Sequence, residues 1–214
     1  MILRYFGHAL FTITLDSGAI ILTDPYGSFC RYPRRSLAAD IVTISHHHYD
    51  HDSLEIVEGR PVVLDEAGYY TPTEEIVITG IPTFHDNHEG LRRGKNVVFS
   101  IEADDLKIVH LGDLGHLPDA RQQAAIGTPD VLLIPVGGTF TLDAQRAYRC
   151  VELLKPRVTI PMHYQTRFSV DLGIATEAEF IRLMGCCPEP QMRLRFTQKS
   201  IGELPRLVLM DISQ

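Results

Sequence analysis

The chain has 214 residues, of which 44% are hydrophobic and 22% charged. These values are ordinary for one soluble globular domain spanning residues 1–214, and they exclude collagen, coiled coil and wholesale disorder. With 20 basic and 27 acidic residues the formal net charge is −7, which argues against a nucleic-acid partner because such binding depends on attraction to phosphates. The unusual count is ten histidines, four of which fall within residues 46–51.

The chain ends and the cysteines bear on location. The N-terminal residues contain no charged segment followed by a long apolar run, so we expect no signal peptide. The longest apolar runs, 20–22 and 131–136, are far shorter than the roughly 20 residues of a membrane-spanning helix. The four cysteines, at 30, 150, 186 and 187, lack C-x-x-C spacing, so free thiols in a reducing, cytoplasmic compartment are expected.

The first half of the chain predicts short strands separated by turns. Alternating or continuous apolar runs with β-branched residues are typical of strands. The expected strands are 11–15, 19–23, 41–45, 61–64, 76–84, 96–102 and 107–111, with turns at 16–18 and 103–105 and one or two helical turns at 53–58.

The second half predicts an alternation of helices and strands. The helix 119–126 starts after Pro118 and stops at Gly127, and the helix 143–154 stops before Pro156. A capping box of Thr176 and Glu179 predicts a third helix that ends near Gly185. The expected strands are 131–136, 158–161 and 207–212. One mixed α/β domain is the simplest interpretation.

A run of histidines and aspartates follows directly on the expected strand 41–45. It reads His46-His47-His48-Tyr49-Asp50-His51. Side chains alternate along an extended backbone, so His46, His48 and Asp50 can share one side, about 6.6 Å apart. Two imidazoles at that spacing can converge on one ion, and a turn can direct Asp50 and His51 at a second. The H-x-H-x-D-H spacing therefore favours a metal site over a solvated loop.

Three further polar residues follow expected strands, where active-site residues are often found. His85 follows 76–84, Asp113 follows 107–111 and His163 follows 158–161. Each alone could equally be a capping or surface residue, but together with the histidine run they favour a metal centre. His88 is an alternative to His85 as a ligand, and we favour His85 because it lies nearest the strand end.

This order of motifs resembles the metallo-β-lactamase-fold hydrolases over nearly the whole chain. It is most similar to a bacterial and archaeal branch of small, stand-alone metal-dependent hydrolases related to the L-ascorbate-6-phosphate lactonase and N-acyl-phosphatidylethanolamine phospholipase D groups. Besides the histidine run, the stretches that carry the resemblance are Gly7-His8-Ala9, Leu22-Thr23-Asp24-Pro25, Arg93-Gly94-Lys95-Asn96, 110–116, 134–138 and Ile160-Pro161-Met162-His163-Tyr164.

The resemblance implies an α/β fold, the four-layer αβ/βα sandwich, with two divalent metal ions at one edge of its sheets. It assigns His46, His48 and His85 to the first ion. It assigns Asp50, His51 and His163 to the second, with Asp113 bridging both. A ligand set of nitrogen and oxygen without cysteine suits zinc, and manganese or iron as well.

Water bound to such ions loses its proton near neutral pH. We therefore expect a metal-dependent hydrolase that acts on an ester, lactone or phosphodiester-type bond of a small molecule. Asp50 is the candidate to orient the nucleophile. His116 is a candidate acid or substrate contact, with a structural histidine as the alternative.

Other side chains are candidates for the surroundings of the metals. Asp24 either holds a ligand imidazole from behind or is a turn aspartate, and His8 and Tyr164 are candidate pocket residues. Arg92, Arg93 and Lys95 form either a site for an anionic substrate or a solvated loop.

Two other functions are compatible with the same residues. A di-iron redox protein on this fold is one, although the flavodiiron group that it resembles carries a glutamate where this chain has His48. A non-catalytic metal-binding module is the other. The substrate, the metal, the number of ions and the oligomeric state, a homo-oligomer included, are left open by the sequence.

Overall fold

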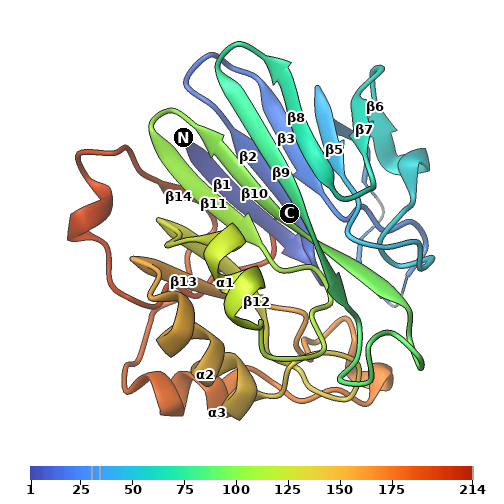
Figure 1. Ribbon diagram of the computed structural model, residues 1–214, viewed down its shortest axis with the longest axis vertical. Helices are drawn as coiled ribbons and strands as arrows, with labels where there is room; N and C mark the ends of the chain where they lie inside the picture. Colours follow the sequence, from blue (N-terminus) through green and yellow to red (C-terminus); the bar gives the residue numbers. More distant parts are fainter. Residues whose placement is uncertain (30, 34, 214) are drawn as a thin grey trace.

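The computed structural model describes residues 1–29, 31–33 and 35–213, and its strands form two six-stranded sheets and one two-stranded sheet (Figure 1). The first sheet has, in spatial order, β14 (Leu194–Arg195), β1 (Ile2–Gly7), β2 (Leu10–Thr14), β3 (Ile20–Thr23), β5 (Ile41–Thr43) and β7 (Val62–Leu64). The second has β13 (Val158–Met162), β12 (Val131–Pro135), β11 (Leu106–His110), β10 (Lys95–Ala103), β9 (Ile76–Phe84) and β8 (Gly68–Thr73). The small sheet pairs β4 (Leu37–Ala38) with β6 (Val57–Glu58).

The main core lies between the two large sheets. Phe11 and Ile13 of β2 belong to the same fully buried cluster as Phe99 and Ile101 of β10. Because side chains alternate along a strand, the neighbouring positions face the other way. Leu10 of β2 accordingly lies in a second cluster, with Leu22, Val42, Tyr26 and Phe29. The first sheet is therefore buried on both faces.

Helices accompany only the second sheet among the described residues. They are α1 (Ala120–Ile126), α2 (Ala144–Leu154) and α3 (Ala178–Met184). The buried residues of α2 and α3 join the main core. On the outer face of the first sheet, the segment after β3 and the 3₁₀ turn η1 (Leu54–Ile56) take the place of α-helices. The expected fold class is confirmed, with one outer layer built from aromatic loop residues.

Most expected elements are present within one or two residues, and the differences have physical reasons. Segment 207–212 is not a strand: Leu207 bridges to Thr159 of β13 and Ile212 to Tyr5 of β1, so the segment runs from one large sheet to the other without joining either ladder. The capping box expected at Thr176 is absent, and Glu177 stands at the N-cap without a side-chain bond. A capping box is instead formed at α1, between Asp119 and Gln122.

The structure bears on two of the expectations about location, the absence of a membrane-spanning helix and the free thiols. Across the described residues, no helix is both long and apolar enough to cross a membrane. Cys150, Cys186 and Cys187 are free thiols, whereas Cys30 lies outside the described residues.

Candidate metal centre

Histidines and aspartates from strand ends of both sheets meet at one edge of the sandwich. β3, β5 and β7 are parallel neighbours in the first sheet, and β11, β12 and β13 are parallel neighbours in the second. Residues that follow parallel strands emerge at the same edge of a sheet. The structure accordingly brings together Asp24 after β3, the run 46–51 after β5, Asp113 after β11 and His163 after β13.

A first group consists of His46, His48 and His85, whose ligand nitrogens all lie within 4.8 Å of one another. His46 and His85 are buried and His48 is exposed, so this group opens to solvent on one side. The Nε2 atom of His46 is buried without a hydrogen-bond partner. A buried lone pair of this kind is costly unless something binds it.

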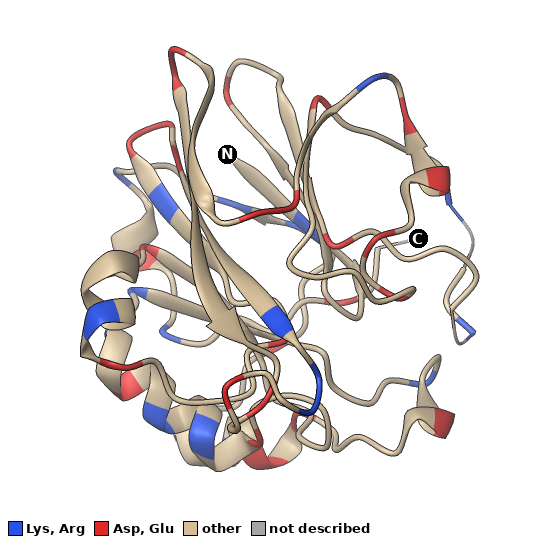
Figure 2. Cartoon of the chain, turned by 45° about the vertical axis from the view of Figure 1, so that its right-hand side comes forward, with Lys and Arg blue, Asp and Glu red and all other residues tan. Residues whose placement is uncertain are grey.

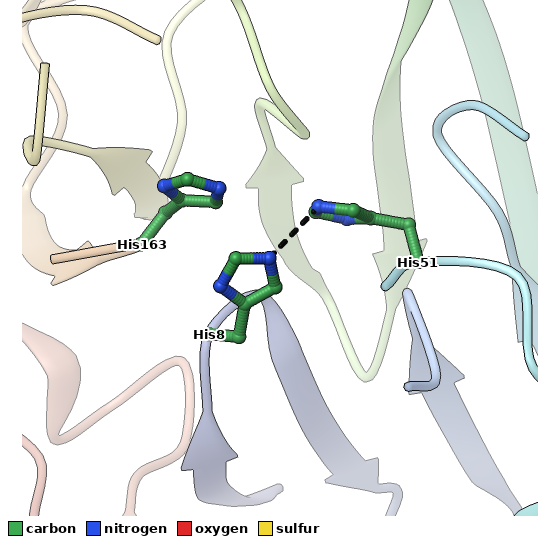
Figure 3. A group of neighbouring side chains, drawn as sticks. All are labelled: His8, His51 and His163. Carbon is green, nitrogen blue, oxygen red and sulfur yellow. Dashed lines mark hydrogen bonds between the residues drawn. The ribbon is translucent and has the colours of Figure 1, made fainter. Parts of the chain in front are cut away.

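A second group consists of His8, His51 and His163, all buried, with ligand nitrogens again within 4.8 Å of one another. Figure 3 shows the three rings turned toward one another from three separate segments of the chain. The Nε2 atoms of His8 and His51 are 3.0 Å apart. Asp50 is next to this group, with Oδ2 lying 3.1 Å from Nε2 of His8 and 3.8 Å from Nε2 of His51.

Asp113 lies between the two groups. Its Oδ2 atom is 3.2 Å from Nε2 of His85 and 3.2 Å from Nε2 of His163. The same oxygen is 3.5 Å from Nε2 of His51 and 4.0 Å from Nε2 of His46. Its Oδ1 atom is buried without a partner. One carboxylate therefore touches histidines of both groups and retains an unused oxygen.

Asp24 holds two of the ligand histidines from behind. Its Oδ1 accepts from the backbone N–H of Ser45 at 2.7 Å, and its Oδ2 accepts from the Ser45 hydroxyl at 2.6 Å. Nδ1 of His51 lies 3.0 Å from the same Oδ2. Nδ1 of His46 lies 2.9 Å from the Ser45 hydroxyl oxygen. Since the hydroxyl proton goes to Asp24, each imidazole donates through Nδ1, which leaves Nε2 as the atom that faces a ligand.

The electrostatics separate these histidines into two kinds. Burial lowers the pKa of His46 to about 3 and that of His8 to about 3, so both rings are neutral at pH 7. Burial also acts to lower the pKa of His51, but Asp113 and Asp24 outweigh it and raise that pKa well above its usual value. Burial acts to raise the pKa of Asp113, while His163 and His51 hold it well below its usual range.

Close backbone approach fixes the position of Asp113. Gly112 has φ +55°, and a Cβ there would lie 2.4 Å from Oδ1 of Asn96 and 2.5 Å from Cβ of Ser45. That Asn96 oxygen accepts from the backbone N–H of Asp113 at 2.9 Å. Only glycine fits this position without a shift of its neighbours. Ser45 and Asn96 are not among the predicted site residues; the sequence signals are a place beside strand ends for both and, for Asn96, a stretch that carries the family resemblance.

Three other candidates lie apart from the cluster. The exposed His88 is outside both groups, so the geometry favours His85. Nε2 of His116 accepts from the backbone N–H of Phe84, and its Nδ1 lies 2.9 Å from the carbonyl oxygen of Leu117. Tyr164 lines a separate cavity of about 620 Å³ with residues 209–212.

Comparison with known proteins identifies the family of this chain. A family model described as "Beta-lactamase superfamily domain" matches residues 2–163. The chain belongs to this superfamily. A "UPF0173 metal-dependent hydrolase" of Thermococcus onnurineus is 32% identical, covering 85% of this chain and 91% of its own, and the corresponding Pyrococcus horikoshii protein is 32% identical with the same coverage.

Two solved structures are similar over almost the whole chain. A Thermotoga maritima protein described as a Zn-dependent hydrolase of the metallo-β-lactamase superfamily is 36% identical, with a TM-score of 0.81 over 98% of this chain and 97% of that one. Igni18, a metallo hydrolase of Ignicoccus hospitalis, shares the fold at 22% identity and a TM-score of 0.72, with 100% and 96% of the two chains covered. The protein is therefore a metal-dependent hydrolase, and it has two histidine groups that could hold metal.

Proposed function

We propose that the protein hydrolyses an ester, lactone or phosphodiester-type bond of a small molecule at a pair of divalent cations, zinc being the first choice. The observation that carries this proposal is the position of Asp113, whose Oδ2 is 3.2 Å from a histidine of each group. A carboxylate placed in this way suits two cations that share it better than it suits one. The all-nitrogen-and-oxygen donor set fits zinc, manganese or iron.

The ligand sets follow from the two groups. His46, His48 and His85 would hold one cation, His51, His163 and Asp50 the other, and Asp113 would serve both. The orphaned Nε2 of His46 and Oδ1 of Asp113 fit this assignment, because each is a buried atom that needs a partner. His8 is close enough to His51 and His163 to act as a further donor or to hold Asp50 in place.

Bound cations of this kind supply an acidified water and polarise the bond to be broken. The protein's own groups do the rest. Asp50 is the candidate to orient the attacking water, because its carboxylate is anchored by His8 at 3.1 Å. His116 is suited to holding the end of β9, since both of its ring nitrogens face backbone groups. Tyr164, which lines the separate cavity of about 620 Å³, takes no part in this proposal.

Metal analysis combined with a substrate panel tests the proposal. Protein loaded with zinc is expected to hold two equivalents and to hydrolyse members of a panel of esters, lactones and bis(p-nitrophenyl) phosphate, and EDTA is expected to abolish the activity. Asp113→Ala should lose most of the metal and the activity together. Full metal content and turnover in this variant would overturn the shared-ligand role, and oxygen or nitric oxide reduction by iron-loaded protein would favour the redox alternative.

A further inference from the structure

A cavity of about 400 Å³ adjoins the first histidine group at His85. His85 forms part of its wall, and three arginines, Arg92, Arg93 and Arg146, line it together with Thr139 and Thr141. Its volume is in the range of small-molecule sites. Figure 2 shows basic residues gathered at the end of the β9–β10 hairpin, on a chain whose charge is otherwise mostly acidic.

Arg93 is held in place with most of its donors unused. One of its terminal nitrogens donates to the carbonyl oxygen of Thr139 at 3.0 Å, and its guanidinium carbon lies 4.7 Å from the centre of the Phe140 ring. Stacking on an aromatic ring fixes the plane of the guanidinium and leaves its edge available. Among the described residues, no carboxylate lies within 4.0 Å of the guanidinium nitrogens of Arg92 or Arg93.

Absent ion pairs are informative here because the chain carries 27 acidic and only 20 basic residues. Arg146 has a carboxylate neighbour, Asp143, but at 3.9 Å and on the surface. Such an exposed pair contributes little, so the arginine remains able to bind another anion.

Asp86 shapes the loop that presents two of these arginines. Its Oδ1 accepts from the backbone N–H groups of His88 and Gly90 at 2.7 and 3.0 Å, and its Oδ2 accepts from those of Arg92 and Arg93 at 2.9 and 2.8 Å. Among the described residues that line the cavity, Asp86 is the only acidic one, and its carboxylate is occupied by backbone donors. Its four hydrogen bonds close the loop that follows His85.

Arg93 also connects this cavity with a second one. A cavity of about 820 Å³ runs past His46 and His48, and Arg93 lines both. A molecule with one end at Arg93 could therefore extend along the first histidine group.

We propose that the 400 Å³ cavity is an oxyanion subsite, in which Arg93, with Arg92 and Arg146, binds a carboxylate or phosphate group of the substrate while the scissile bond lies at the histidine cluster. This inference rests on the proposed hydrolytic function and names its substrate class as small anionic molecules. Guanidinium groups bind both oxyanions through paired N–H donors, so the chemistry is shared by the two.

Matched substrates test the subsite. Zinc-loaded protein is assayed with pairs of aryl esters that differ only in a terminal carboxylate, and with phosphate monoester and neutral counterparts. We expect kcat/KM to favour the charged member of at least one pair, and Arg93→Gln to lower the charged-to-neutral ratio about ten- to a hundred-fold, mainly through KM. Arg206→Gln is the matched control, because Arg206 is an exposed arginine paired with Glu152; it should leave the ratio unchanged. Which pair responds distinguishes carboxylate from phosphate.

The result also separates the subsite from the hydrolase proposal. Hydrolysis of both pair members with equal efficiency, unaltered in Arg93→Gln, would overturn the subsite and leave the hydrolase proposal standing. If no ester is hydrolysed, direct binding decides: titration of the EDTA-treated protein with inorganic phosphate and with succinate should show binding that Arg93→Gln weakens at least about tenfold. If the wild-type protein and Arg93→Gln bind each anion with the same affinity, the subsite proposal is overturned.

Discussion

Replacing Asp24 by asparagine should weaken metal binding at both positions, although Asp24 is not one of the proposed ligands. The buried carboxylate accepts from the Ser45 N–H, the Ser45 hydroxyl and Nδ1 of His51. An asparagine offers one acceptor oxygen and one NH₂ donor in its place. If its oxygen takes the Ser45 N–H, its NH₂ faces the hydroxyl and the imidazole; in the other orientation its NH₂ faces the Ser45 N–H.

The first orientation reverses the hydrogen bonds behind two ligands. The Ser45 hydroxyl would accept from the introduced amide and donate to Nδ1 of His46, which moves the His46 proton to Nε2. His51 would face an amide donor at Nδ1 and would therefore keep its proton at Nε2. Nε2 is the atom that would bind metal, so both ions lose a ligand lone pair. Partners behind metal-bound histidines typically contribute 10–100-fold to metal affinity, or about 1.4–2.7 kcal/mol, and we expect at least this loss for each ion in Asp24→Asn.

The assay is competition for zinc between EDTA-stripped protein and a chromophoric chelator. Asp130→Asn is the matched control, because Asp130 accepts a backbone N–H from Lys107 at 2.9 Å at the other end of the strands. Ser45→Ala separates the two sites: it removes the link to His46 and leaves the direct Asp24–His51 contact, so only one ion should bind more weakly. Wild-type affinity for both ions in Asp24→Asn would refute the reasoning. If that variant does not fold, the same conclusion follows when Ser45→Ala leaves the affinity for zinc at the His46 group unchanged.

Three further predictions concern protons and the shared carboxylate. Because the pKa of His51 is raised well above its usual value, zinc must displace its proton, so calorimetric titrations in buffers of different ionisation enthalpy should show proton release at pH 7; no release would contradict the assignment. His8 and His46, with pKa values of about 3, stay neutral in the fold but become charged in the unfolded chain. The unfolded state thus binds more protons below about pH 6.5, and EDTA-treated protein should lose up to about 1.4 kcal/mol of stability per pH unit for each ring from about pH 6 to 4; an unchanged urea midpoint over this range would count against neutral rings. His51 does not oppose this slope, because its stabilising contribution is fully present below about pH 6.5. Asp113→Asn should weaken the binding of both ions, and by more than Asp50→Asn does. Metal content after dialysis would show the difference.

Local sequence predicts much of this molecule. The strand at β9 was expected at 76–84 and is found as Ile76–Phe84. The run 46–51 stands just after β5, as strand periodicity predicts, and its role as a set of metal ligands stays a prediction. Edge strand β8 (Gly68–Thr73) was missed, since it contains Gly68 and Pro72, residues that are rare inside sheets and tolerated at edges.

The site residues that escaped prediction depend on how loops close and strands pair. Asp86 looks like a solvated loop aspartate until the loop turns back and directs four N–H groups at it. Ser45 gains its role only when β3 and β5 pair and bring Asp24 beside it. Neither arrangement shows in the sequence as a characteristic spacing. The candidate metal ligands of residues 46–51 do show one, because they stand close together in one short segment.

Backbone strain at this edge is held in place by the protein's own contacts. His8, Asp24 and His163 have φ values of 56°, 40° and 50°, in the left-handed region that non-glycine residues seldom adopt. Each such residue costs on the order of 1 kcal/mol and persists only where its surroundings fix it. The surroundings that fix them are protein groups: the backbone carbonyl of His8 accepts from the N–H of His163 and from the Tyr5 hydroxyl, and the Asp24 N–H donates to the carbonyl oxygen of Thr43. Strand pairing and core packing therefore hold these turns in the left-handed region.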